Sequence, residues 1–460
     1  MRRKDGMTAT HIEGSFTNRL VDDVQAIARA GLSEADLTRT KAALIDYLGV
    51  ALAGTSEESA RIARGFVEAE GGHPRSTLIG TATKTSMSQA SLVNSIAAHA
   101  LDLDDTSIFV GGHATSVIMP AALAVGEALG STGQDILVAY SAGVHAMSVV
   151  GLATGAESYA RGFHNTGTVG VFGSAVAAGV LARLDDDAMR RALSLAATQA
   201  SGLKAVFGTM GKHLNAGRAA ANGVFAAFAA KEGFSAPDDG IEAPRGYQWT
   251  HSDRLDVDRV DRELAGRSGI SGVVAKRHAC CHGTHSAVES IRAAKALRDF
   301  ADDEIVSVVL TARPIVRGTC DIPAPVTGLE GKFSLRYVSA LALAGEPTTS
   351  EGFTDEKTRD PRLVALRDKV SVQVAEGMSF GETRVSVALV DGTRIDTNVN
   401  AISAVEDPDL DAHLEAMSLK FADLADPLIG ADRAARVVAV ARDFENVASC
   451  DELNGLLTVE

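Results

Sequence analysis

The sequence contains few cysteines, few aromatic residues and fewer basic than acidic residues. Only four cysteines occur in 460 residues, and two of them are adjacent, so a disulfide framework is excluded and a reducing compartment fits. Lys and Arg number 44 against 59 Asp and Glu, which gives a net charge of −15. This balance disfavours nucleic acid and anionic membranes as main partners, because both are bound chiefly through clustered Lys and Arg. A small anionic ligand is still allowed, since a pocket can differ in charge from the whole surface.

Long apolar runs also look scarce. The longest weakly polar stretches, residues 170–182 and 219–230, span about a dozen residues, whereas a membrane helix needs about 20. Residues 1–14 begin with basic side chains but lack the apolar core of a signal peptide, and Met7 is a candidate for the natural start. We therefore expect a cytoplasmic protein that is not associated with a membrane.

Alanine and glycine, in contrast, are abundant between residues 16 and 231, and the apolar residues there have helical spacing. Leu20, Val24 and Ile27 recur three and four positions apart, as in an amphipathic helix. Ser33 before an acidic turn suits a helix start, and Gly54 suits its end. Several later segments are apolar all round, which predicts helices buried in a two-layered core.

The composition changes after this region. Residues 233–272 are rich in Pro, Asp, Gly and Arg and predict a boundary. Further on, Asp391 and Gly392 lie between two alternating segments, which is a strong hairpin signal. The predicted strands are residues 305–311, 370–374, 384–390 and 393–399, the helices between them are residues 285–300 and 332–344, and helices return after residue 407.

These patterns predict a mainly α protein with two domains. The larger domain is all-helical and consists of residues 14–272 together with 404–460. The smaller is an α+β lid domain of residues 273–403.

Three carboxylates crowd the end of an apolar helix in the segment Ala-His-Ala-Leu-Asp-Leu-Asp-Asp-Thr at residues 98–106. Asp102, Asp104 and Asp105 are costly together unless a cation balances them or one of them holds a proton. The segment, with His113 downstream, is therefore a candidate site. The alternative is a helix end with solvated acids.

Two further segments combine glycine with basic residues. His164 precedes a helix in a glycine-rich stretch whose spacing does not fit a dinucleotide loop, so close helix packing explains the glycines better. Lys212 and His213 stand in an apparent loop before an apolar helix. A buried cation would need a partner there, and without one a solvated basic loop is the simpler interpretation.

The densest cluster runs from Lys276 to His285 and includes Cys280, Cys281 and His282. Zinc and iron–sulfur sites are disfavoured, because the paired spacings that such sites use are missing. A lysine, histidines and a cysteine near a domain boundary instead suit carboxylate binding and proton transfer.

Taken together, these four segments resemble the MmgE/PrpD family over nearly the whole chain. The carrying residues are the run at 98–106, His113, Gly162-Phe163-His164, Gly208-Thr209-Met210 with Lys212, and Lys276 with Cys280-Cys281 and Thr284-His285. The resemblance implies a helical domain built from both chain ends, an α+β lid, an active site in the cleft between them, and a homodimer.

The resemblance also implies site residues. The catalytic positions are Asp102, His113, His164, Lys212 and Lys276, and the candidate substrate-binding residues are Asn215, Cys281, His282 and His285. Two departures concern the reaction: Cys281 stands where some decarboxylating members have histidine, and Asn215 replaces a frequent histidine. The active-site tyrosine of some members has no clear counterpart near residues 313–319.

The reactions of the family labilise a bond next to a carboxylate, so lysines are expected to face the developing charge and histidines to move protons. We expect a cofactor-independent, metal-independent lyase acting on a small polycarboxylate, with dehydration of a 2-methylcitrate-like acid as the leading reaction. Decarboxylation of cis-aconitate to itaconate is second, and epimerisation of an iminodisuccinate-type acid is third. A non-catalytic helical scaffold is the alternative from another class, and it would be expected to have lost some of these polar groups.

Overall fold

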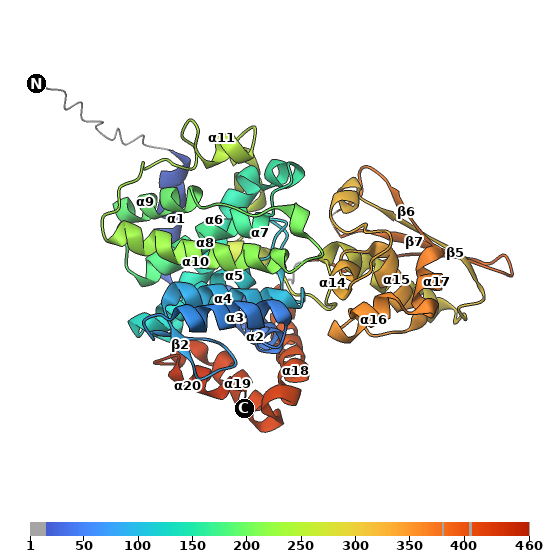
Figure 1. The fold of residues 1–460 in the computed structure, drawn as a ribbon. Coiled ribbons are helices and arrows are strands. Elements are labelled where there is room, and N and C mark those ends of the chain that lie inside the picture. The colour runs from blue at the N-terminus through green and yellow to red at the C-terminus, as the bar shows by residue number, and fades with distance from the viewer. Residues whose placement is uncertain (1–14, 380, 404–406, 460) are drawn as a thin grey trace, which may run out of the picture.

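A computed structural model describes residues 15–379, 381–403 and 407–459 of the chain. Figure 1 shows a large body of helices and a smaller orange lobe that contains a sheet. The predicted class, mainly α with an α+β lid, is confirmed. Residues 1–14, for which the sequence predicted no signal peptide and a candidate natural start at Met7, lie outside the described residues.

The large body is built around helices that are buried on nearly all sides. The central ones are α2 (Glu34–Gly54), α4 (Met87–Ala100), α5 (Thr115–Leu129), α6 (Gly133–Ala160), α8 (Gly170–Leu181) and α10 (Gly211–Lys231). Ser33 caps α2 as predicted, since its hydroxyl accepts a hydrogen bond from the amide of Asp36 at 3.1 Å. Glycine brings α6 and α8 together: a Cβ on Gly173 would lie 2.9 Å from the carbonyl oxygen of Gly143.

Helix α6 shows that the expected scarcity of long apolar runs is wrong. It has 28 residues and contains a longer weakly polar stretch than the two named above. By length and composition alone it could cross a membrane, but 94% of its most apolar window is buried inside the fold. The sequence search missed this stretch because His145 and several small polar residues interrupt it.

Shorter elements surround this core. They are α1 (Phe16–Ala30), α3 (Glu58–Glu70), β1 (Ser76–Thr77), β2 (Lys84–Thr85), α7 (Asn165–Thr168), α9 (Asp186–Ala197), α11 (Tyr247–His251) and α12 (Val257–Glu263).

The orange lobe contains a four-stranded sheet of order β6-β5-β7-β8. Its elements are α13 (His285–Leu297), β5 (Ile305–Ala312), α14 (Gly328–Gly331), α15 (Leu335–Ala344), α16 (Asp355–Thr358), α17 (Pro361–Asp368), β6 (Val370–Val374), β7 (Arg384–Leu389) and β8 (Arg394–Asn398). Strands β5 and β6 are parallel and the other pairs antiparallel. The predicted hairpin turn is present, with Gly392 at φ 84°.

The chain returns to the large body at its end. Helices α18 (Leu410–Ile429), α19 (Ala431–Arg442) and α20 (Asp451–Leu456) are drawn in red below the blue helices in Figure 1, and α18 packs along α2. Lys420 of α18 donates to the carbonyl oxygen of Leu103 at 2.9 Å and lies 2.5 Å from a carboxylate oxygen of Asp46. The last helices therefore contact the loop after α4.

That loop also pairs with the start of the lid. Strand β3 (Thr106–Ser107) pairs antiparallel with β4 (Val273–Val274). Lys276 follows β4 by two residues, so this short ribbon brings the lid segment to the loop that carries the acidic cluster.

Candidate active site

Asp102 lies at the centre of a buried ionic cluster. Its Oδ1 atom is 2.8 Å from Nζ of Lys212 and 2.7 Å from Nζ of Lys276. Lys276 also donates to the backbone carbonyl of Asp102 at 2.8 Å. Asp102 adopts a left-handed conformation with φ 53°, which turns the chain sharply at the end of α4.

The charges of this cluster stabilise one another. Burial alone would raise the pKa of Asp102, but Lys212 and Lys276 bring that pKa well below its usual range. Burial would likewise lower the pKa of Lys276, yet the nearby Asp102 and Asp104 raise it. The two ammonium groups are therefore balanced by two carboxylates, Asp102 and Asp104, in a site almost closed to water.

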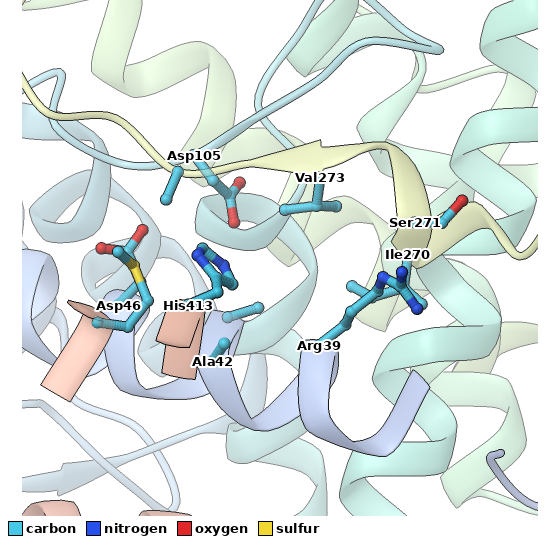
Figure 2. Close-up of a pocket in the computed structure, with 11 residues that line it drawn as sticks. Arg39, Ala42, Asp46, Asp105, Ile270, Ser271, Val273 and His413 are labelled. Atoms are coloured by element: carbon cyan, nitrogen blue, oxygen red, sulfur yellow. The ribbon is translucent and has the colours of Figure 1, made fainter. Parts of the chain in front are cut away.

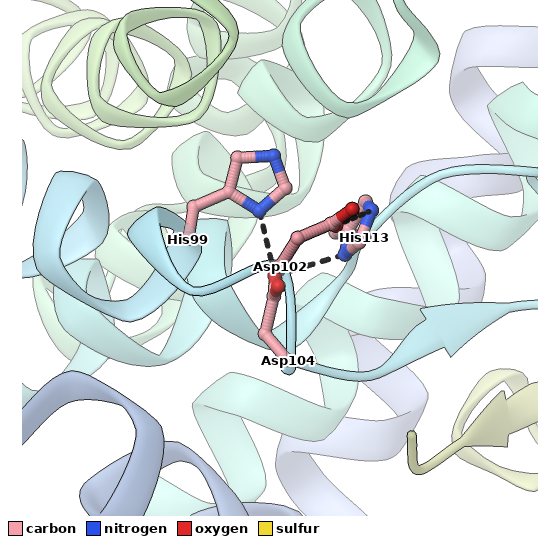
Figure 3. Close-up of side chains that lie close together, drawn as sticks. All are labelled: His99, Asp102, Asp104 and His113. Atoms are coloured by element: carbon pink, nitrogen blue, oxygen red, sulfur yellow. Dashed lines mark hydrogen bonds and ion pairs between the residues drawn. The ribbon is translucent and has the colours of Figure 1, made fainter. Parts of the chain in front are cut away.

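A second carboxylate, Asp104, holds two imidazoles. Its Oδ2 atom is 2.8 Å from Nδ1 of His99 and 2.9 Å from Nδ1 of His113, as Figure 3 shows. The other ring nitrogen of His113 lies 3.6 Å from Oδ1 of Asp102, so His113 connects the two carboxylates. Sequence reasoning had not assigned a role to His99 or Asp104, although both belong to the run at residues 98–106 that drew attention to the site.

The imidazoles around the site are neutral at pH 7. Burial is the largest cause that lowers the pKa of each: His99, His113, His164, His213, His282 and His285. For His113 the pKa falls to about 3. Lys212 adds to the effect at His113 and His164, because a nearby ammonium disfavours a second positive charge.

The third carboxylate, Asp105, forms no ion pair with a described Lys or Arg side chain. Burial, followed by the charge of Asp46, raises its pKa to about 7. It accepts hydrogen bonds from the amide of Thr115 at 3.2 Å and from the hydroxyl of the same residue. Asp46, Asp105 and His413 line a small cavity of about 20 Å³ behind the loop, shown in Figure 2. This volume suits a single water molecule.

A larger cavity of about 330 Å³ lies between the helical body and the lid. Six predicted residues line it: Asp102, His113, His164, Lys212, Cys281 and His282. The rest of the wall is mostly apolar and includes Ile108, Phe109 and Val316, and two arginines from the two domains, Arg259 and Arg313, line it as well. The space has the size and mixed character of a small-molecule site.

Three predicted residues lie behind the wall of this cavity. Lys276 is 1% exposed and supports Asp102 from behind. The side-chain amide nitrogen of Asn215 lies 3.1 Å from Nδ1 of His164 and so orients that ring. His285 packs against the ring of His282, with Nε2 3.4 Å from the carbonyl oxygen of Cys280. His282 itself lies 2.6 Å from the hydroxyl of Thr106 through Nδ1.

The structure corrects the interpretation of Lys212 and His213 as a solvated basic loop. Both lie in the first turn of α10 and are buried, at 2% and 4% exposure. The helix begins earlier than its apolar pattern indicated because the ion pair with Asp102 compensates the burial of Lys212. His164 is the N-cap residue of α7, close to its predicted place before a helix.

The four groups in Figure 3 also have the spacing of a metal site. One ligand atom from each of His99, Asp102, Asp104 and His113 lies within 4.8 Å of the others. However, Asp102 already contacts two ammonium groups, and these would repel a divalent cation. We interpret the cluster as a charge-balanced hydrogen-bonding network.

Two thiols open on the cavity. Cys281 and Cys320 both line it, and a hydrogen bond from Cys320 lowers the pKa of the Cys281 thiol. Cys280, the adjacent residue, contacts Thr284 and not the cavity, and burial raises its pKa to about 12. The two neighbouring cysteines therefore differ in reactivity.

Iodoacetamide is expected to alkylate Cys281 before the other cysteines and to abolish turnover, because the adduct occupies the cavity. Cys320→Ala should slow this labelling, since the hydrogen bond to the thiolate is lost, whereas Cys450→Ala should not. Peptide mass spectrometry and residual activity measure both effects. Labelling of Cys280 or Cys450 ahead of Cys281 contradicts the assignment.

Comparison with known proteins agrees with this geometry. The family model of the MmgE/PrpD N-terminal domain matches residues 18–259, and that of the C-terminal domain matches residues 278–446. The chain is 26% identical to the cis-aconitate decarboxylase of Homo sapiens, over 96% of this chain and 94% of the relative. It is 25% identical to the cis-aconitate decarboxylase-like protein oryM of Aspergillus oryzae (97% and 98% covered) and 27% identical to the cis-aconitate decarboxylase of Aspergillus terreus (72% and 74% covered). The chain therefore belongs to the MmgE/PrpD family, as a lyase.

Proposed function

We propose that this lyase decarboxylates cis-aconitate or a closely similar unsaturated tricarboxylate. The observation that carries the proposal is the cavity, in which Lys212, His113 and His164 face a space large enough for a small tricarboxylic acid. Relatives that span most of the chain are named for this reaction, which adds support. We therefore favour decarboxylation over dehydration, which was the leading reaction expected from the sequence alone.

The chemistry sets clear requirements. The bond between a methylene carbon and its carboxylate breaks, carbon dioxide leaves, and the bonding pair forms a new double bond to that methylene carbon. The pair of the old double bond moves to the carbon beside another carboxylate, giving an enolate-like state, and one proton then adds there. The enzyme must therefore supply a fixed cation near that carboxylate and one proton donor near that carbon.

Lys212 fits the role of the fixed cation. It lines the cavity, and the ion pair with Asp102 holds its ammonium in place. Lys276 supplies a second positive charge behind the same carboxylate, so Asp102 alone does not neutralise the charge of Lys212. Preorganised charge of this kind is typically worth about 3 to 4 kcal/mol per donor in the transition state.

The apolar part of the wall suits the departing carboxylate. Ile108, Phe109 and Val316 line the same cavity and offer no hydrogen-bonding side chain. A carboxylate that loses its water next to such side chains is destabilised relative to neutral carbon dioxide. Arg259 and Arg313 line the same cavity and bring positive charge toward the substrate's other carboxylates.

The proton is assigned to His164 or His113. Both are neutral in the free protein, because burial lowers their pKa values. A bound trianion favours the protonated form of a nearby imidazole, so substrate binding would load the proton that the reaction consumes. His164 is the better donor, since Asn215 occupies its Nδ1 and leaves Nε2 for the substrate.

Dehydration of a 2-methylcitrate-like acid is the second candidate. Cys281 lines the cavity at the position where the family resemblance places a histidine in some decarboxylating members. This departure from the pattern of those decarboxylases is the observation that favours dehydration.

The test is to incubate chelator-treated protein with cis-aconitate, methylcitrate, citrate and iminodisuccinate and to follow products by NMR in D₂O. Release of carbon dioxide with one deuterium in the product supports decarboxylation. A new alkene with all carbons retained indicates a dehydratase, and deuterium exchange without net conversion indicates an epimerase. Loss of activity on chelation contradicts the metal-free scheme.

A further inference from the structure

Lys332 is a buried cation that sequence reasoning did not single out. It lies in the lid between α14 and α15 and is 4% exposed. Its Nζ atom donates to the backbone carbonyl of Leu101 at 2.8 Å and approaches that of Ala100 at 3.4 Å. In the part of the chain that the structure describes, no carboxylate lies within ion-pair distance of it. A buried lysine without a carboxylate partner is costly and needs a reason.

The two carbonyls that it contacts belong to Ala100, the last residue of α4, and to Leu101, its C-cap residue. The carboxyl end of a helix carries a partial negative charge and has carbonyls without a partner in the helix, so an ammonium group is favourable there. The unusual feature is the origin of this cation. It comes from the lid, more than two hundred residues away in the sequence, and closes the end of a helix in the other domain.

The contact has a direct geometrical effect on Asp102. The carbonyl of Leu101 and the amide of Asp102 belong to one peptide unit, so a hydrogen bond to that carbonyl fixes the plane of the unit. Lys276 holds the next carbonyl, that of Asp102 itself, at 2.8 Å. The left-handed φ of 53° at Asp102 lies between these two held peptide units. Non-glycine residues rarely adopt this conformation, and although aspartate does so more readily than most, contacts on both sides stabilise it here.

We infer that Lys332 is a positioning residue for Asp102: its ammonium, carried by the lid, holds the peptide unit before Asp102 so that the carboxylate faces Lys212 and Lys276. The lid thereby contributes to the arrangement of the charge cluster as well as to the wall of the cavity. The kinetic part of this inference rests on the proposed function. The structural part does not depend on which reaction is catalysed.

The charge of Lys332 is sensitive to pH. Burial lowers its pKa to about 8, while Asp102 and Glu57 oppose the shift and Lys212 and Lys276 add to it. His213 also faces this ammonium. As the pH rises through about 8, Lys332 loses its proton. The hydrogen bonds to the carbonyls of Ala100 and Leu101 then weaken, and the electrostatic potential at Asp102 changes.

Lys332→Met is expected to lower kcat at least tenfold while KM changes less than twofold, because Lys332 does not line the cavity. The decline of kcat above pH 8 in the wild type should be missing in this variant, and Lys332→Arg should recover part of the rate. Lys369→Met is the matched control: Lys369 also lies in the lid and donates to a backbone carbonyl, that of Asp302, at 2.8 Å. It should leave kcat and its pH profile unchanged.

Amide hydrogen exchange separates this inference from the choice of reaction. In Lys332→Met the amides of residues 101–105 should exchange at least tenfold faster than in the wild type, whether or not a substrate is known. Lys369→Met should not change them. Unchanged exchange in this loop overturns the inference. Faster exchange without turnover of any tested acid leaves it standing and counts against the proposed decarboxylation. Faster exchange throughout the chain also overturns it, because the role is then one of general stability.

Discussion

Asp102→Asn is expected to lower kcat/KM at least a hundredfold and to destabilise the fold by about 3 to 5 kcal/mol. The substitution keeps the shape of the side chain but removes a charge that lies within 2.8 Å of both Lys212 and Lys276. Two buried ammonium groups then repel each other in a medium that hardly screens them. Turnover should fall because Lys212 loses its ion-pair partner, and stability should fall because the buried ammonium of Lys276 loses the carboxylate that contacts it.

A double variant separates the two effects. Adding Lys276→Met to Asp102→Asn removes one unpaired ammonium, so the urea midpoint should recover by at least half while turnover stays low. Asp261→Asn is the matched control, because this aspartate forms its ion pair with Arg19 at the exposed surface. If Asp102→Asn retains more than a tenth of the wild-type kcat/KM, the assignment of Asp102 to the charge cluster that catalyses the reaction is wrong.

The second large effect is a steep loss of stability in mild acid. In the unfolded chain each imidazole takes up a proton near pH 6.5, whereas burial lowers the pKa of six imidazoles around the site. The unfolded state therefore binds more protons below pH 6.5, and stability is lost as the pH falls. Each such imidazole contributes up to about 1.4 kcal/mol per pH unit until its folded pKa is reached.

Carboxyl groups with raised pKa values act in the opposite direction. Burial raises the pKa of Asp46, Asp105 and Asp321, to about 7 for Asp105, so the folded state binds protons at these groups more readily than the unfolded chain does. Their contribution is present at low pH and is lost as the pH rises toward 7. Since the six imidazoles around the site outnumber these three carboxyl groups, the urea midpoint should fall steeply between pH 7 and pH 5.

Urea titrations at pH 8, 7, 6 and 5 measure this dependence. His285→Gln should make it shallower by about one proton, because one buried neutral imidazole is removed from behind the cavity. His73→Gln changes an exposed histidine and should leave the slope as it is. A midpoint that is the same at pH 7 and pH 5 contradicts the view that these rings are buried in the neutral form.

The acidic run shows how far the sequence could predict the site. Three carboxylates in four positions required either cations or a bound proton, and both solutions occur. Asp102 is balanced by two lysines, Asp104 contacts two imidazoles, and burial raises the pKa of Asp105 to about 7. Which carboxylate has which partner could not be predicted, because the two lysines come from distant segments of the chain.

Features that depend on neighbouring residues could be predicted from the sequence, whereas contacts between distant residues could not. The strands of the lid and the cap at Ser33 could be predicted because alternation and capping depend on neighbouring residues. Lys332 and Lys420 could not, since an isolated lysine in an apolar stretch gives no signal until the fold brings a helix end to it. For the same reason, the segment around Lys212 taken by itself favoured a solvated loop, and only the family resemblance pointed to a site residue there.

The backbone of the loop after α4 has a consequence for biosynthesis. Three successive carbonyls, of Leu101, Asp102 and Leu103, each accept a hydrogen bond from a lysine, and these lysines are Lys332, Lys276 and Lys420. The loop emerges from the ribosome long before any of them, and Lys420 emerges last. A nascent chain can therefore form most of the helical body while its charge centre stays unassembled, and such a chain should be inactive until α18 has been translated and has docked on α2.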